Sequence, residues 1–370
     1  MNDGYPLMAF IANEGVAPKG ERYDRSSLVS DTENKLYKRT ESGDFIYSSN
    51  NLETGSIGLN KYGNASISPV YSVFQPTGIA DSDFLGRRLV CKDFINAMVK
   101  WRQGVIYGQW RIHESDFIKI EIPVPSVEEQ RKIGAILDDL DNLITLHQRK
   151  LLKLKNVKKA MLEKMFPKNG STVPEIRFAG FTDAWEQRKL GEIAEQTYGG
   201  GTPRTSVDEF WNGDIPWIQS SDLTDGKVFG VIPNKMISLS GLKNSATKLV
   251  PENSIAIITR VGVGKLAFMP FSYTTSQDFL SLSKLNIDPW FGVYSCYKKL
   301  QSELHAVQGT SIKGITKDEL LGKEILVPCV NEQEQIGRLF RQLDNLIALH
   351  QRKYEKLQNL KKACLEKMFV

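Results

Sequence analysis

The sequence has few cysteines and no segment that directs a chain into or across a membrane. Its four cysteines are far apart and form no C-x-x-C pair, which argues against a disulfide framework and against the usual zinc motifs. Residues 1–5 are neither basic nor strongly apolar, so they do not resemble a signal peptide, and the apolar run Ile255–Ile258 is far shorter than a membrane span. These absences predict a cytoplasmic protein. The four cysteines are Cys91, Cys296, Cys329 and Cys364.

Motifs of catalysis and nucleotide binding are also missing. The segment Gly262–Lys265 lacks the spacing and the following hydroxyl residue of a phosphate-binding loop, and the glycines of Gly199–Thr202 follow no clear buried strand. Asp288–Phe291 reads D-P-W-F, which lacks the second proline of an adenine methyltransferase tetrad. No Cys/His or Ser/His/Asp set has suggestive spacing. The sequence therefore predicts that the chain carries no catalytic, cofactor or metal site of its own.

What the chain does contain is an ordinary globular composition. Hydrophobic residues make up 41% and charged residues 25% of its 370 residues, enough for two or three domains with their own cores. The formal net charge of +5 permits an anionic partner without requiring one.

A long internal repeat organises the sequence. Residues 121–166 and 324–369 align without gaps at an offset of 203, and 30 of the 46 aligned positions are identical. Each copy has a short strand-like run that ends in proline, at Pro125 and Pro328, followed by acidic and polar residues suited to the first turn of a helix. A period this long indicates duplication of a whole domain together with its helix.

Both copies predict one long helix with a narrow apolar stripe. Seam residues recur at alternating steps of three and four, which is the rhythm of a coiled coil. About 38 residues at 1.5 Å per residue give a helix of about 57 Å, longer than a small domain needs. The predicted seam residues are Leu137, Leu140, Ile144, His147, Leu151 and Leu154 in the first copy, and Phe340, Leu343, Ile347, His350, Tyr354 and Leu357 in the second.

These helices favour pairing with each other, because their opposite faces are heavily charged. The alternative is that each packs only on its own globular domain. Two seam positions are polar in both copies, His147 with His350 and Lys158 with Lys361. They either set the register of the pair or, for the histidines, bind a metal ion; a histidine on a seam is more often hydrogen-bonded.

The remaining segments are rich in Gly, Ser, Thr, Asn and aromatic residues with short β-branched runs, which predicts mixed α/β domains. We therefore expect an α+β protein in which two such domains alternate with the two long helices. The predicted segments are residues 1–123, 124–168, 169–326 and 327–370.

Several motifs resemble the specificity subunits of type I restriction-modification systems. The repeated P-x-x-x-E-Q pattern at Pro125 and Pro328, with Leu-Asp-Asn-Leu-Ile after it, matches the helical regions of that family. The resemblance covers nearly the whole chain, and the duplicated arrangement is more specific than any single motif. The matching segments of the globular domains are Gly58–Tyr71, Lys189–Ile193, Gly200–Pro203, Phe210–Ile218 and Gly262–Lys265.

The resemblance implies that this chain recognises DNA and that partner subunits carry out catalysis. Two target-recognition domains each read half of a split target in double-stranded DNA, and the helices pair as an antiparallel coiled coil that spaces them. The helices also dock two methyltransferase subunits, which recruit motor-nuclease subunits. S-adenosylmethionine, ATP and magnesium then belong to those partners, and no membrane is involved.

Candidate DNA contacts are the polar, cationic and aromatic residues of these motifs and of neighbouring turns. Such side chains can bind base edges or phosphates, although polar turns that only face water are the alternative for any single residue. The candidates are Lys61, Tyr62, Asn64, Arg111, Thr202, Arg204, Trp217, Gln219, Ser220, Ser221, Arg260, Lys265, Thr275, Gln277 and Lys313.

One feature departs from the family pattern. At the offset of 203, Met1 aligns with Arg204, so residues 167–203 have no counterpart in the first half. We expect an incomplete first recognition domain, from truncation, recombination or a misassigned start. Two other functions compete with DNA reading: a coiled-coil adaptor or inactive recombination cassette without its own DNA specificity, and a stand-alone methyltransferase or nuclease, whose motifs are missing.

Overall fold

The computed structural model describes residues 4–18, 36–106, 109–168, 170–306 and 314–369. The chain divides into two compact units, one made of residues 1–146 and 353–370 and the other of residues 147–352. Each unit combines a globular part with portions of both long helices. The prediction of an α+β protein with two mixed domains and paired helices is confirmed. The four segment boundaries stay a prediction.

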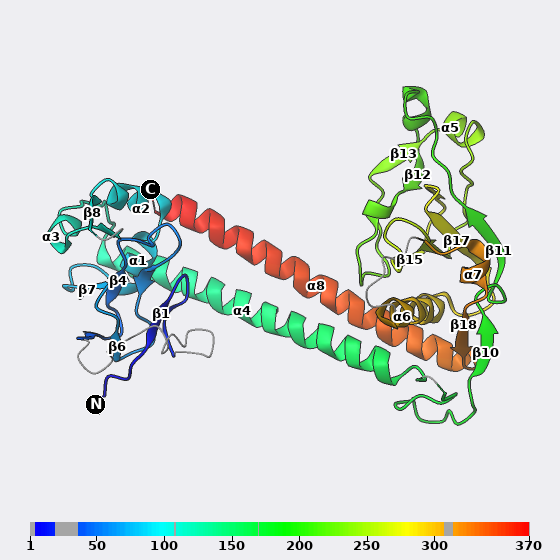
Figure 1. Cartoon of the computed structure of the whole chain (residues 1–370), viewed down its shortest axis with the longest axis horizontal. Helices are drawn as coiled ribbons and strands as arrows, with labels where there is room; N and C mark the ends of the chain where they lie inside the picture. Colours follow the sequence, from blue (N-terminus) through cyan, green and yellow to red (C-terminus); the bar gives the residue numbers. More distant parts are fainter. Residues whose placement is uncertain (1–3, 19–35, 107–108, 169, 307–313, 370) are drawn as a thin grey trace. The chain divides into compact units, whose positions relative to one another are not determined.

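The two long helices are α4 (Val127–Lys164) and α8 (Val330–Met368). They lie side by side (Figure 1), and three contacts give their direction: Asp141 pairs with Lys361, His147 with His350, and Lys158 with Asp344. Because the partner's number falls along α8 as the number rises along α4, the helices are antiparallel within each unit. No helix of the described residues is both long and apolar enough to cross a membrane.

The predicted seam residues form a row of buried and half-buried side chains along both helices. Leu137, Leu140 and Leu151 of α4 are buried, as are Phe340 and Leu343 of α8. The half-buried members are Ile144, His147, Leu154, Ile347, His350, Tyr354 and Leu357.

The side chains at the polar seam positions make polar contacts across the helix pair. The Nδ1 atoms of His147 and His350 are 2.8 Å apart, the separation of a hydrogen bond between two imidazole rings. Lys158 forms an ion pair with Asp344, and its repeat counterpart Lys361 forms one with Asp141. Among the described residues no group of three His, Cys, Asp or Glu side chains gathers around the histidines or elsewhere.

The first unit contains small sheets with short strands. In the central sheet, β4 (Phe45–Tyr47) lies between β5 (Ile57–Leu59) and β7 (Ser72–Phe74), antiparallel to both. Among the described residues, three further two-stranded sheets pair β1 (Ala9–Ile11) with β2 (Gly15–Ala17), β3 (Lys38–Thr40) with β6 (Ala65–Ile67), and β8 (Gln103–Ile106) with β9 (Gln109–Arg111). Its short helices are α1 (Ser82–Arg88), α2 (Lys92–Val99) and α3 (Glu114–Phe117).

The second unit has a larger core. Its antiparallel four-stranded sheet has the order β11 (Ala194–Gly199), β17 (Phe279–Leu285), β14 (Ser254–Ile258), β15 (Leu266–Met269). A three-stranded sheet places β12 (Ile215–Ile218) between β13 (Lys235–Ile237) and β16 (Thr274–Thr275). The strands β10 (Glu186–Lys189) and β18 (Glu324–Val327) pair with each other. In the part of this unit that the structure describes, the shorter helices are α5 (Leu239–Lys243), α6 (Pro289–Ala306) and α7 (Lys317–Leu321), besides two 3₁₀ turns.

The same contact fastens each globular part to a long helix. The side chain of Gln130 accepts from the Asp81 N–H and donates to the Pro125 carbonyl, both at 2.8 Å. Gln333 does the same with the Asp288 N–H and the Pro328 carbonyl, again at 2.8 Å. Asp81 and Asp288 in turn accept from the N–H three residues later, at the starts of α1 and α6.

The glutamine of the repeated P-x-x-x-E-Q pattern therefore anchors a short helix of the globular part that precedes it in the sequence, α1 for Gln130 and α6 for Gln333. The D-P-W-F segment that begins at Asp288 is likewise explained as a helix start. Each of these short helices also makes an aromatic contact with a phenylalanine at the end of a repeat copy. Phe84 of α1 lies against Phe369, with ring centroids 5.1 Å apart, and Phe291 of α6 lies against Phe166 at 5.7 Å.

One strand prediction is wrong. The run Glu324–Val327 forms a strand paired with β10, but the equivalent run around Ile122 forms none. Pro123 stands where the second copy has Leu326, so the first copy lacks one of the backbone N–H groups that a strand can donate.

Candidate nucleic-acid interface

The second unit carries two adjacent concavities at the edge of its four-stranded sheet. The first, of about 470 Å³, lies between the turn after β12, the β14–β15 hairpin and the β16–β17 turn. Seven of the predicted DNA contacts line it, so loops that are far apart in the sequence converge there. These residues are Thr202, Trp217, Gln219, Ser220, Ser221, Lys265 and Gln277.

Close backbone packing shapes this first concavity. A Cβ atom on Gly200 would lie 1.9 Å from the Ser276 carbonyl oxygen, so only glycine allows the end of β11 to approach the β16–β17 turn. The Trp217 ring is buried, and its Nε1 donates to the Gly201 carbonyl at 2.9 Å. Trp217 therefore forms part of the wall, with its polar atom already paired.

The exposed rim beside Trp217 carries a cation over aromatic rings. Trp211 meets Trp217 edge-on with ring centroids 5.0 Å apart, and Lys235 Nζ lies 5.4 and 5.7 Å from the two ring centroids. This arrangement suits a cation–π interaction.

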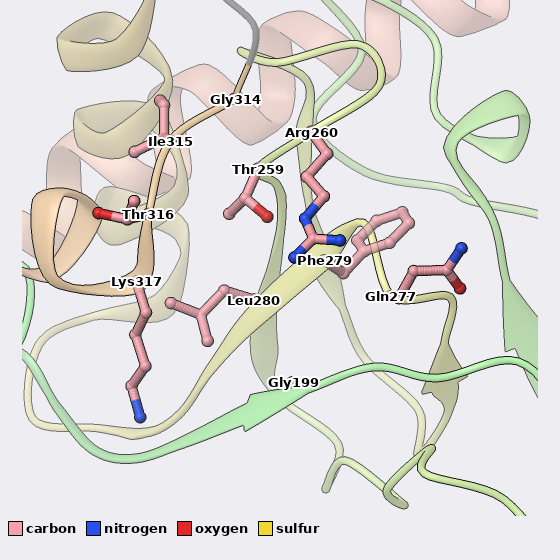
Figure 2. A pocket seen from close by; sticks show the side chains of 10 residues that line it. All are labelled: Gly199, Thr259, Arg260, Gln277, Phe279, Leu280, Gly314, Ile315, Thr316 and Lys317. Atoms are coloured by element: carbon pink, nitrogen blue, oxygen red, sulfur yellow. The ribbon is translucent and has the colours of Figure 1, made fainter.

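The second concavity, of about 750 Å³, has a more cationic lining. Figure 2 shows the Arg260 side chain next to the Phe279 ring, with Gln277 to one side and Lys317 to the other. Thr259 and Thr316 add hydroxyl groups. Two cations and two hydroxyls above an apolar floor can bind the oxygens of phosphate groups. Gln277 lines both concavities, which places this second lining beside the first.

The start of α7 holds part of the second concavity in place. Thr316 and Glu319 form a capping box, in which Thr316 Oγ1 accepts from the Glu319 N–H at 3.2 Å and the Thr316 N–H donates to Glu319 at 2.8 Å. The Thr316 backbone and hydroxyl groups lower the pKa of the Glu319 carboxyl. The T-x-x-E pattern for this cap is readable in the sequence, so it could have pointed to Thr316.

Not every predicted contact in this unit reaches a concavity. Thr275 is 1% exposed and lines neither, so it supports the strand rather than the surface. Arg204 is exposed but lies outside both linings, and Lys313 lies outside the described residues. Sequence reasoning missed Asp278 and Lys317, which do line the concavities. Asp278 belongs to no recognisable motif and reaches its place through the long-range pairing of β17, whereas Lys317 is the first residue of α7, directly after the Thr316 cap.

The candidates of the first unit occupy two different places. Lys61, Tyr62 and Asn64 are exposed in the loop between β5 and β6. Lys61 Nζ lies 3.5 Å from Asp83 and 3.6 Å from Asp138, so its charge is largely balanced. Arg111 is exposed at the end of β9, and no contact found among the described residues joins it to Lys61.

The loop around Lys61 is held by Asn60, which the sequence did not single out. Asn60 is fully buried. Its Oδ1 accepts from the N–H groups of Tyr62 and Gly63, and its Nδ2 donates to the Gly63 carbonyl and to Thr40. These four bonds fix the loop shape and present the side chains of Lys61 and Tyr62 outward.

Comparison with known proteins gives the family. The model of the type I restriction modification DNA specificity domain matches residues 12–156 and, a second time, residues 182–359. The chain belongs to this family. Both matches extend from a globular part into a long helix, in agreement with the duplication read from the sequence.

Individual relatives are specificity subunits of type I restriction enzymes. The MjaVIII subunit of Methanocaldococcus jannaschii is 26% identical over 325 residues, which cover 83% of this chain and 74% of the relative. The EcoR124I/EcoR124II subunit of Escherichia coli is 32% identical over 194 residues, 47% of each chain. The chain spans only 60% of the MjaX subunit and 44% of the MjaIX subunit of M. jannaschii.

Solved structures share the fold. The S subunit of a type I restriction-modification system from M. genitalium superimposes with a TM-score of 0.61 at 14% identity, covering 98% of this chain and 88% of that one. A chain from a study of complex assembly in a type I system gives a TM-score of 0.51 at 20% identity, with coverages of 91% and 84%.

Proposed function

We propose that the chain is the non-catalytic specificity subunit of a type I restriction-modification complex and binds double-stranded DNA in a sequence-specific manner. The observation that carries this proposal is the convergence of seven predicted contact residues on one concavity, with Arg260 and Lys317 in the lining next to it. Membership of the type I specificity family supports the role in a restriction-modification complex. The polar and cationic side chains of the second unit support DNA binding.

The two linings suit two kinds of contact. Arg260 and Lys317, with the hydroxyls of Thr259 and Thr316, would hold backbone phosphates and so fix the protein's register on the duplex. The amide and hydroxyl groups of Gln219, Ser220 and Gln277 would face base edges, where donor and acceptor patterns distinguish the base pairs. Gln277 lines both concavities, so it would lie between the phosphate contacts and the base contacts.

A bipartite target follows from the duplication. Both globular parts are fastened to the paired helices by the same glutamine contact, through Gln130 and Gln333. Two DNA-binding globular parts that are anchored in the same way would contact two half-sites of the target, at a spacing set by the helix pair. We expect catalysis, and with it S-adenosylmethionine, ATP and magnesium, to belong to partner subunits.

The helices also offer a repeated surface for such partners. On α4, Leu143 and Leu146 are 43% and 44% exposed, and at the equivalent positions of α8 Leu346 and Leu349 are 43% and 46% exposed. Residues three apart share a helix face, so each helix presents the same apolar pair. Two equal patches would dock two copies of one methyltransferase subunit, and motor-nuclease subunits would join through these.

The test is selection of bound duplexes from a random DNA library by the full chain reconstituted with its methyltransferase subunit. We expect two conserved blocks of bases at one fixed spacing. A Gln277→Ala variant should weaken the base preference within one block and leave the other block unchanged. Binding with no base preference would reject the proposal in favour of an adaptor that only holds protein partners.

A further inference from the structure

The first concavity contains a carboxylate that phosphate binding does not explain. Asp278 lies in the β16–β17 turn and lines this concavity with Ser220 and Gln277. A negative group in a surface that binds polyanionic DNA is repelled by the phosphates. Its presence there calls for a ligand group that donates hydrogen bonds.

The Asp278 carboxylate is poorly satisfied within the protein. Its Oδ2 accepts from Ser220 Oγ at 3.4 Å and from Ser276 Oγ at 3.3 Å, both long for hydroxyl donors. Among the described residues, Oδ1 has no hydrogen-bond donor and the carboxylate makes no ion pair. Lys265 lines the same concavity without pairing with it.

Hydrogen bonds to the Asp278 backbone hold the turn that carries this side chain. The Asp278 carbonyl accepts from the Thr259 N–H at 2.7 Å and from the Thr259 hydroxyl at 3.0 Å. The turn is thereby tied to the base of the β14–β15 hairpin. Asp278 is half-buried, so water would be expelled from its carboxylate when DNA covers the concavity, and that loss must be offset by a new donor.

We propose that Asp278 is a specificity-determining residue that accepts a hydrogen bond from the exocyclic amino group of a cytosine or an adenine. In the major groove only the N4 amino group of cytosine and the N6 amino group of adenine donate hydrogen bonds, whereas guanine and thymine present oxygen atoms to the same region. The carboxylate therefore favours C or A at one position of the contacted strand and repels G or T there. This inference rests on the proposed DNA-reading function.

The experiment compares the wild-type chain with Asp278→Asn in the same reconstituted complex and random duplex library. Asparagine keeps the size of the side chain and adds a donor, so discrimination against G or T at one position should fall by about 5- to 150-fold. Preferences at other positions should not change. Asp225→Asn is the matched control, since it removes one exposed carboxylate of the same unit away from the concavity, and it should leave the preferred sequence unchanged.

Other outcomes separate the two proposals. If the wild-type chain selects two blocks and Asp278→Asn selects the same bases, the inference about Asp278 is wrong and the proposed function stands. The inference is also wrong if the variant changes the binding of all sequences equally. If the wild-type chain selects no sequence, the proposed function fails and the inference with it. Asp278→Ala, which removes the carboxylate without adding a donor, should lower the same discrimination and covers the case of a poorly folding Asp278→Asn.

Discussion

Lys158 of α4 and Asp344 of α8 form a buried ion pair, in which Nζ lies 2.6 and 2.8 Å from the two carboxylate oxygens. The Tyr294 hydroxyl donates to the same carboxylate at 2.6 Å, and burial together with the Asp344 charge raises the pKa of Tyr294, so the phenol stays a donor. The repeat has the equivalent pair, Lys361 with Asp141, at 2.5 Å, and there Arg87 takes the place of the tyrosine at 2.9 Å.

Replacing Asp344 by Ala should destabilise the protein strongly. The change leaves the Lys158 ammonium buried without its partner, and such losses cost about 3–5 kcal/mol. The matched change Asp141→Ala acts on a carboxylate that is 37% exposed, and it should cost only about 1 kcal/mol. Urea unfolding of the full chain, followed by circular dichroism, measures both. Equal losses of unfolding free energy would show that the difference in burial does not make one ion pair contribute more to stability than the other.

Two equivalent glycines should respond in opposite ways to alanine. A Cβ atom on Gly337 would lie 2.6 Å from Asp288 Oδ1 and 2.9 Å from the Phe291 nitrogen, so Gly337→Ala must push α6 away at a cost of about 1–3 kcal/mol. At Gly134 the nearest atom is 3.8 Å away, and alanine should stabilise the helix by up to about 1 kcal/mol. Thermal unfolding of the two variants decides. If Gly134→Ala is destabilised, the 3.8 Å separation between this position and the start of α1 does not leave room for a methyl group.

The sequence was sufficient to predict these helices but not their contacts with the domains. A gap-free repeat and its seven-residue rhythm predicted α4 and α8 because helix geometry depends on local spacing. Gln130 and Gln333 were visible only as polar residues of a first turn; their function as anchors requires knowing where α1 and α6 start. The concavity depends on strand pairings between distant segments, so Asp278 could not be placed beside Ser220 from spacing alone.

The Lys298 ammonium should make stability depend on pH in the alkaline range. Burial, followed by the charge of Lys168, lowers the pKa of Lys298 to about 8 from 10.5, while Nζ donates to the carbonyls of Phe166 and Pro167. Between these two pKa values the unfolded chain binds more protons than the folded chain. The free energy of unfolding should therefore rise with pH from about 8 to about 10.5 through this group.

Lys298→Met removes that contribution. The difference in unfolding free energy between the wild-type chain and the variant should shift in favour of the wild type as the pH rises from 7 to 9.5. Denaturant unfolding at several pH values measures it, and Lys248→Met, at an exposed lysine of the same unit, controls for general charge effects. A difference that stays constant with pH would show that the Lys298 pKa is ordinary.

The leucine pairs on the long helices should control how many partner subunits bind. Leu143→Asp places a charge in the exposed apolar pair of α4, and Leu346→Asp does the same on α8. Each variant should release one methyltransferase subunit from the complex, and the double variant should release both. Mass photometry of the reconstituted complex counts the subunits. Leu152→Asp, at a position 62% exposed and outside the repeated pairs, should leave the count unchanged. Full assembly of the double variant would place the docking surface elsewhere.

Phosphate contacts and base contacts in the second unit should be separable by salt. Arg260→Ala removes a cation from the second concavity, and if Arg260 binds a phosphate, the dependence of log affinity on log salt concentration should become shallower by about one unit. Affinity should then fall to a similar extent on all duplexes. Gln277→Ala should instead lower the affinity for the selected sequence and keep the salt slope. Arg188→Ala is the control, because Arg188 already pairs with Glu186 at 2.8 Å and lines neither concavity. Titrations of the reconstituted complex from 50 to 200 mM salt on selected and unselected duplexes measure both effects. An unchanged slope in Arg260→Ala would remove Arg260 from the phosphate-binding surface.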